Sequence, residues 1–189
     1  EDLMRMAGIR DTDITEGVLE ASKNRVIWLI VNLGTAILAS AVISFFDATI
    51  EQMVALAVLM PIVASMGGNA GTQTMTVTVR AIATRDLTSS NVRRIIFREL
   101  LIALLNGAII AAIIGGLCWV WFNSPALGGV MGIAMVVNII MAGLAGILVP
   151  VTLDKLDIDP ALASSIFVTT ITDVVGFFAF LGLAAAVLL

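Results

Sequence analysis

The chain has 189 residues, of which 60% are hydrophobic and only 13% are charged, with a formal net charge of −4. Soluble domains carry about 45–50% apolar and about 25% charged residues, so the composition excludes a soluble enzyme, a nucleic-acid-binding protein and a disordered segment. The absence of histidine excludes an imidazole-bound haem and a Ser–His dyad, and the single cysteine, Cys118, excludes an intrachain disulfide. The composition predicts an all-α membrane protein that crosses the lipid bilayer several times.

The apolar runs predict five transmembrane helices, because a helix needs about 20 apolar residues to cross a hydrocarbon core about 30 Å thick. We expect the spans at residues 26–46, 53 to the low eighties, 95–121, 127–153 and 161–189. The polar residues 1–25 are expected to form a cytoplasmic connecting helix with Asp13 as its N-cap. Short polar connections are expected at residues 47–52, 80–98, 123–125 and 154–160.

The second span is unusual because Pro61 lies inside it and Gly67, Gly68 and Gly71 follow. Proline removes a backbone donor, and glycine weakens a helix. We therefore expect this helix to be kinked or broken at Pro61 and the glycine-rich segment.

The distribution of lysine and arginine predicts the orientation in the membrane. All ten lie in the N-terminal segment, the second connection or the fourth: Arg5, Arg10, Lys23, Arg25, Arg80, Arg85, Arg93, Arg94, Arg98 and Lys155. The positive-inside rule therefore predicts a cytoplasmic N-terminus and a C-terminus outside the cell.

The fifth span carries the strongest functional signal, Asp173, near its middle. A carboxylate at the bilayer midplane costs at least about 2.5–3.5 kcal/mol, so it usually faces a hydrated cavity or a partner. Helical spacing places four other residues on the same helix face as Asp173: Ser165, Thr169, Thr172 and Gly176. We interpret this face as the lining of an ion pathway. The alternative is a protonated Asp173 that hydrogen-bonds a neighbouring helix.

Polar side chains also share one face of the second span: Asn69, Gln73, Thr76 and Arg80. Amide oxygens suit a hydrated hard cation such as Mg²⁺. An interhelical hydrogen-bonded ladder could use the same amides. At the opposite end, Asp47 and Glu51 could concentrate cations at an extracellular mouth, or could be ordinary solvated acids.

Small residues predict close helix packing in two other spans. Gly128 and Gly132 form a GxxxG motif, and Gly107, Ala111 and Gly115 form a second ridge. We favour packing inside one subunit over a dedicated dimer face.

Residues 61–73, PIVASMGGNAGTQ, resemble the GGNxGxQ signature of the MgtE family of magnesium channels. Residues 25–33 resemble the entry to that family's first span, and residues 159–173 resemble its last span. The three segments are spread over nearly the whole chain.

The resemblance implies a homodimer with a pore on its two-fold axis, lined by the fifth span of each subunit. It implies that Asp173 binds hydrated Mg²⁺, that Thr169 offers its backbone carbonyl, and that Asn69 lies along the pore. Ser165 stands where some members have an asparagine near the cytoplasmic gate. Together with Thr172 and Gln73, these residues form the expected metal site. The expected partners are a second copy, the lipid bilayer and Mg²⁺, with Mn²⁺, Co²⁺ or Ca²⁺ as substitute ions.

The resemblance also implies location in the plasma (inner) membrane. Full-length members carry an acidic N-terminal domain and paired CBS domains that sense cytosolic Mg²⁺. Neither is expected in this chain, so we expect residues 1–25 to join sensor to pore and residues 26–189 to be the pore domain.

Coordination chemistry fits this reading, because Mg²⁺ keeps most of its water and usually binds through one or two carboxylates. Two other functions stay open. A proton-coupled secondary transporter would use Asp173 as its proton carrier. An intramembrane aspartyl protease would need two carboxylates at a shared water, and one chain supplies only one mid-membrane acid, so we do not expect an enzyme.

Overall fold

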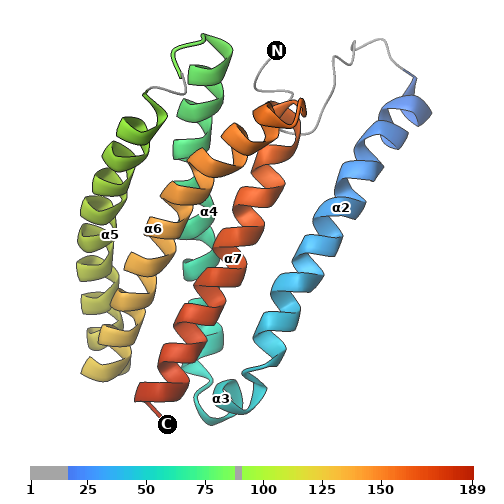
Figure 1. Cartoon of the computed structure of the whole chain (residues 1–189). Coiled ribbons are helices and arrows are strands. Elements are labelled where there is room, and N and C mark those ends of the chain that lie inside the picture. Colours follow the sequence, from blue (N-terminus) through green and yellow to red (C-terminus); the bar gives the residue numbers. More distant parts are fainter. Residues whose placement is uncertain (1–16, 88–90) are drawn as a thin grey trace.

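The structure, a computed structural model, describes residues 17–87 and 91–189. In these ranges the secondary structure is entirely helical (Figure 1). The helices are α2 (Val18–Ser44), α3 (Asp47–Gln52), α4 (Ala55–Ala83), α5 (Val92–Phe122), α6 (Pro125–Lys155) and α7 (Pro160–Val187). All but the short α3 are long and apolar enough to cross a membrane, which confirms the predicted all-α, five-span fold.

Several helix boundaries differ from the predicted spans. Residues 47–52, expected as a turn, form helix α3, and Asp47 in its first turn complements the positive end of the helix dipole. The basic connection is shorter than expected, because α4 continues to Ala83 and α5 begins at Val92. The expected N-cap Asp13 lies outside the described residues.

Helix α4 is continuous across Pro61 and the glycines, so it is not broken. Pro61 is its seventh residue, where a proline removes only the one hydrogen bond that its N–H would donate to the carbonyl oxygen of Ala57. Gly67 and Gly71 are buried, so packing against neighbouring helices compensates for their low helix propensity. A bend at Pro61 stays a prediction.

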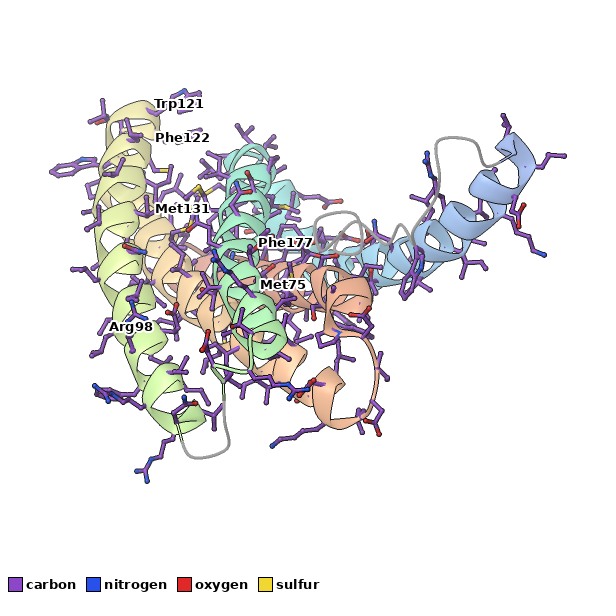
Figure 2. All side chains as sticks on the ribbon, turned by 90° about the horizontal axis from the view of Figure 1, so that it is seen from above. Met75, Arg98, Trp121, Phe122, Met131 and Phe177 are labelled. Atoms are coloured by element: carbon purple, nitrogen blue, oxygen red, sulfur yellow. The ribbon has the colours of Figure 1, made fainter. Side chains whose placement is uncertain are left out.

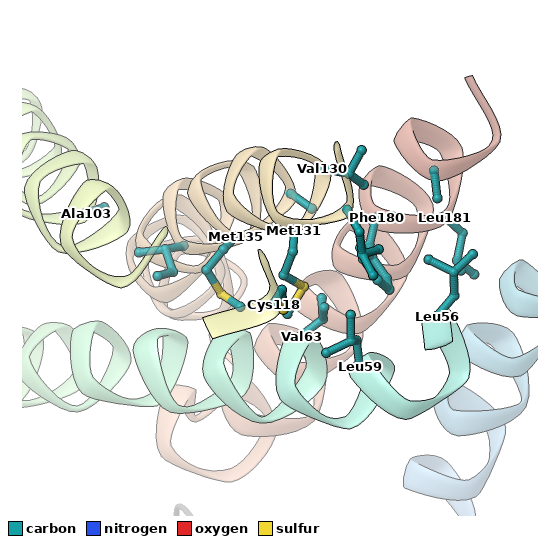
Figure 3. Packing of buried hydrophobic residues seen from close by; sticks show 14 residues of the cluster. Leu56, Leu59, Val63, Ala103, Cys118, Val130, Met131, Met135, Phe180 and Leu181 are labelled. Carbon is teal, nitrogen blue, oxygen red and sulfur yellow. The ribbon is translucent and has the colours of Figure 1, made fainter. Parts of the chain in front are cut away.

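Helix α6 lies at the centre of the bundle and packs against α4, α5 and α7. In the apolar 18-residue segment of α6, 56% of the residues are buried, compared with 6% in the corresponding segment of α2 and 11% in that of α5. Figures 1 and 2 show α2 set apart from the other long helices, beside α7. The apolar core contains Met131, Met135 and the free Cys118, packed near Val63 of α4 (Figure 3).

The small-residue ridges join α5 to α6 within one subunit. A Cβ atom placed on Gly115 would lie 2.9 Å from the carbonyl oxygen of Gly128, and one on Gly132 would lie 3.3 Å from that of Ala111. Gly107 faces Val136 and Ile139 in the same interface. This confirms packing inside the subunit as the role of both motifs.

The bundle has two ends of different charge. Figure 1 shows the beginnings of α2, α5 and α7 at the same end as the ends of α4 and α6. All lysines and arginines of the described residues belong to these segments: Lys23, Arg25, Arg80, Arg85, Arg93, Arg94, Arg98 and Lys155. Helix α3, with the exposed Asp47 and Glu51, lies at the opposite end. The fold therefore gathers the basic residues at one end of the bundle.

Candidate functional site

Asp173 occupies the middle of a transmembrane helix. It is the 14th of the 28 residues of α7, which places it about 20 Å from Pro160 along the helix axis. Its side chain is half-buried, and it has no hydrogen bond or ion pair with any described residue. Because a charged carboxylate is costly in hydrocarbon, an ionised Asp173 needs water, an ion or a second molecule beside it.

The predicted stripe on α7 divides into two edges. Thr172 and Gly176 are buried, whereas Ser165, Thr169 and Asp173 are half-buried and follow one another at four-residue steps. Three of the predicted site residues therefore form a row on one helix edge, which we name the Asp173 row (Ser165, Thr169, Asp173). Thr172 lies beside this row and faces the protein interior.

Threonine hydroxyl groups donate hydrogen bonds to backbone carbonyl oxygens along the Asp173 row. The Thr169 hydroxyl donates to the carbonyl oxygen of Ser165 at 2.8 Å, and the Thr172 hydroxyl donates to that of Thr169 at 2.9 Å. A helix carbonyl also accepts the backbone N–H four residues later. The Thr169 carbonyl, expected to face an ion, therefore has both lone pairs engaged in this structure.

The glycines of α4 allow this helix to approach α7 one turn before Asp173. A Cβ atom on Gly71 would lie 2.5 Å from Cγ1 of Val168 and 3.7 Å from Cγ2 of Thr172. One on Gly68 would lie 3.8 Å from Cγ2 of Thr169. The GGNAG segment therefore provides close helix contact within a continuous helix.

Asn69 and Gln73 lie on a different side of α4. They line a cavity of about 470 Å³ between α4 and α5, and no residue of α7 lines it. Both side chains are exposed and form no hydrogen bond with the described residues, so they take part in no interhelical ladder within residues 17–87 and 91–189 of one subunit. The structure thus does not bring these amides and Asp173 into one cavity of the subunit.

The same cavity contains polar residues that the sequence reasoning missed. Arg98, Glu99 and Asn106 of α5 contribute to its lining, and none has a hydrogen bond or ion pair with a described residue. Asn106 could have been noticed as a polar residue in an apolar run. Glu99 was hidden by its place beside the basic connection.

Asn138 of α6 is a second residue that the sequence reasoning missed. Its side chain is fully buried, and its Nδ2 donates to the carbonyl oxygen of Val63 in α4 at 2.9 Å. The available signal was a single amide within the otherwise apolar segment 125–151. Its neighbours belong to both helices that carry predicted site residues.

The described residues contain no group of three or more His, Cys, Asp or Glu side chains that could hold a metal ion. Within this part of one subunit, Asp173 is therefore not a member of such a cluster. Mg²⁺ sites often use one or two carboxylates and retained water, so a single acid at each of two related positions is a chemically adequate donor set.

Comparison with known proteins decides the family. A family model described as the divalent cation transporter MgtE matches residues 60–183. The chain belongs to the MgtE family. The matched region includes Asp173, Asn69 and Asn138.

Three curated MgtE proteins support this membership. The chain is 35% identical to the magnesium transporter MgtE of Enterococcus faecalis over 184 residues, which covers 97% of this chain and 41% of the relative. It is 32% identical to that of Bacillus subtilis, covering 88% of this chain and 37% of the relative. It is also 32% identical to that of Thermus thermophilus, covering 100% and 42%. The chain thus spans about two fifths of these MgtE proteins.

Proposed function

We propose that this chain is the membrane-spanning part of a Mg²⁺ channel of the plasma membrane, and that hydrated Mg²⁺ enters passively along the Asp173 row. The observation that carries the proposal is the unpartnered carboxylate of Asp173 at mid-span. A divalent cation compensates the cost of such a charge. The relatives, which are named magnesium transporters, support the choice of ion.

In this proposal two copies of the chain place their Asp173 rows around a shared axis. Two carboxylates then hold one hydrated Mg²⁺ through its waters, which agrees with the reluctance of this ion to lose its octahedral shell. The pair must bind weakly enough for the ion to leave. The Thr169 carbonyl contributes after the Thr172 hydroxyl turns away, or through a water molecule.

Asn69 and Gln73 have a separate role in the proposal. With Glu99 and Asn106 they make the α4–α5 cavity polar, and their oxygens can hydrogen-bond the water shell of a cation. Because this cavity has no α7 residue in its lining, the amides act at a different step from Asp173.

The orientation follows from charge. The basic end of the bundle faces the cytoplasm, and α3, with Asp47 and Glu51, faces outside. Residues before 26 form the connection to the cytoplasmic regulatory domains of a longer protein.

The test is Mg²⁺ flux into liposomes containing purified wild-type protein or the Asp173→Asn variant. Asparagine keeps the shape of the side chain and removes its charge, so we expect folded protein with flux reduced to background. Asp157→Asn is the matched control, because Asp157 is exposed at the basic end and has a φ of 57° that asparagine tolerates.

Two results would contradict parts of this proposal. Wild-type flux in folded Asp173→Asn would remove Asp173 from the ion pathway. A Mg²⁺ flux that requires a proton gradient would replace the passive channel with the proton-coupled transporter.

A further inference from the structure

Asn138 contacts both helices that carry the predicted site residues, α4 and α7. It is the 14th residue of the 31-residue α6, and its side chain has 0% exposure. Its Nδ2 donates to the carbonyl oxygen of Val63, one turn before Gly67 of α4. A carbonyl oxygen only accepts hydrogen bonds, so this contact fixes which end of the amide faces α4.

Two glycines on different helices provide the space for this amide. A Cβ atom on Gly67 of α4 would lie 2.9 Å from Oδ1 of Asn138 and would overlap its Nδ2. A Cβ atom on Gly176 of α7 would lie 2.7 Å from the same Nδ2. Gly67 is two residues before Asn69, and Gly176 is three residues after Asp173. The amide therefore lies where α4, α6 and α7 meet, close in sequence to both groups of site residues.

This arrangement is inefficient if its only purpose is stability. The Oδ1 atom of Asn138 is buried and has no hydrogen-bond partner among the described residues. A half-satisfied buried amide stabilises a protein less than an apolar side chain of the same shape. A leucine has the same branched shape, although its two methyl groups are larger than the oxygen and nitrogen of the amide. With leucine at this position the carbonyl oxygen of Val63 would still accept a hydrogen bond, because in a helix it accepts the backbone N–H of Gly67. Unlike the contacts of a leucine, the directional hydrogen bond of Asn138 favours one register of α6 against α4.

We infer that Asn138 is a positioning residue for ion passage. Its hydrogen bond to Val63, together with its fit between Gly67 and Gly176, sets the register of α4 against the Asp173 row. It acts on the cation only through these helices. This inference rests on the proposed function, because it assigns a role in the same transport step.

The experiment compares Asn138→Leu with wild type and with Met135→Leu in liposomes. Met135 is also fully buried on α6, three residues earlier, and a Met-to-Leu change conserves volume. Two quantities are measured for each protein: the Mg²⁺ concentration that gives half-maximal flux, and the thermal unfolding temperature. A role in packing alone predicts that the first quantity stays constant in every folded variant.

We expect Asn138→Leu to fold with some loss of unfolding temperature, because its methyl groups overpack the space between Gly67 and Gly176. We expect its half-saturating Mg²⁺ concentration to rise about tenfold, the lower end of the cost of losing a supporting partner of a metal site. We expect Met135→Leu to match wild type in both. The double variant Gly67→Ala/Asn138→Ala is a second test, because the new methyl group at 67 occupies space left by the amide. It should show the same loss of apparent affinity.

Three results would overturn the inference. The first is a wild-type half-saturating concentration in either folded Asn138 variant. The second is failure of both variants to fold while Met135→Leu folds, which would make Asn138 a folding residue. The third, absence of Mg²⁺ flux in wild-type protein, would overturn the proposed function as well. If flux is lost in Asp173→Asn, the first result would overturn the positioning role alone and leave the proposed function standing.

Discussion

At the scale of single residues, the candidate pathway depends on which polar groups are already engaged within the subunit. Asp173 has no partner among the described residues, whereas the Thr169 carbonyl accepts the hydroxyl of Thr172. An ion at this position would compete with that hydroxyl for the carbonyl lone pair. Thr172 is therefore expected to tune how strongly the row binds a cation, although it is buried and cannot touch the ion itself.

The Thr172→Val variant tests this competition. Valine keeps the shape of threonine and removes the hydroxyl, so the Thr169 carbonyl gains a free lone pair. We expect a lower half-saturating Mg²⁺ concentration in liposome flux, with unfolding stability changed by no more than about 1 kcal/mol, the net value of a typical hydrogen bond. Thr170→Val is the control, since its hydroxyl donates to Ile166 instead. Equal Mg²⁺ dependence in both variants would exclude the competition.

At the scale of helices, the contact between α4 and α7 depends on the absence of side chains at the glycine signature. Gly71 packs so closely against Val168 that no space is left for a methyl group, and it lies at ordinary contact distance from Thr172. Close approach without side chains is the usual basis of helix association in membranes. The signature thus determines how near the α4 backbone lies to the Asp173 row.

Gly71→Ala is expected to destabilise the protein by about 1–3 kcal/mol, the usual cost of overpacking a core. Adding Val168→Ala should recover part of this loss, because the clash is with Cγ1 of Val168. Gly129→Ala is the matched control: an added Cβ there meets nothing within 4 Å, so its stability should stay at or slightly above wild type. Unfolding in detergent measures all three. Equal stability of Gly71→Ala and Gly129→Ala would show that α4 and α7 leave space for a methyl group at position 71.

At the scale of the whole molecule, charge separates the two ends of the bundle. The described lysines and arginines lie at the end where α4 leads to α5 and α6 leads to α7, and α3 lies at the other end. An odd number of spans also places the two ends of the five-helix segment on opposite sides of the membrane. The positive-inside rule then gives a definite orientation to test.

Cysteine labelling in whole cells tests this orientation. Cys118 is buried and is first replaced by alanine. A cysteine at the exposed Ala48 of α3 should react with a membrane-impermeant maleimide from outside the cell. A cysteine at the exposed Lys155 should react only after the membrane is opened. The reverse pattern would overturn the proposed orientation.

The sequence alone was sufficient for the number of spans and the helical fold, and it also led to the prediction that Asp173 binds the ion. These depend on local properties: the length of each apolar run and the cost of placing one charge at mid-span. The packing role of Gly128 and Gly132 was also predictable, because small residues four apart on a membrane helix allow close approach whatever the partner.

Tertiary structure alone decided which face of each helix meets which neighbour. Spacing placed Thr172 with Asp173, but packing against α4 buries Thr172 and leaves the acid half-exposed. Spacing also suggested that Asn69 and Gln73 face the ion with Asp173, yet they line a cavity beside α5. Asn138 acquired its significance only when Gly67 and Gly176 were brought to it from distant parts of the chain. The physical reason is that lipid tails are as apolar as a helix surface, so hydropathy does not distinguish a buried face from a lipid-facing one. Shape and hydrogen bonding between helices make that distinction, and both exist only once the helices are assembled.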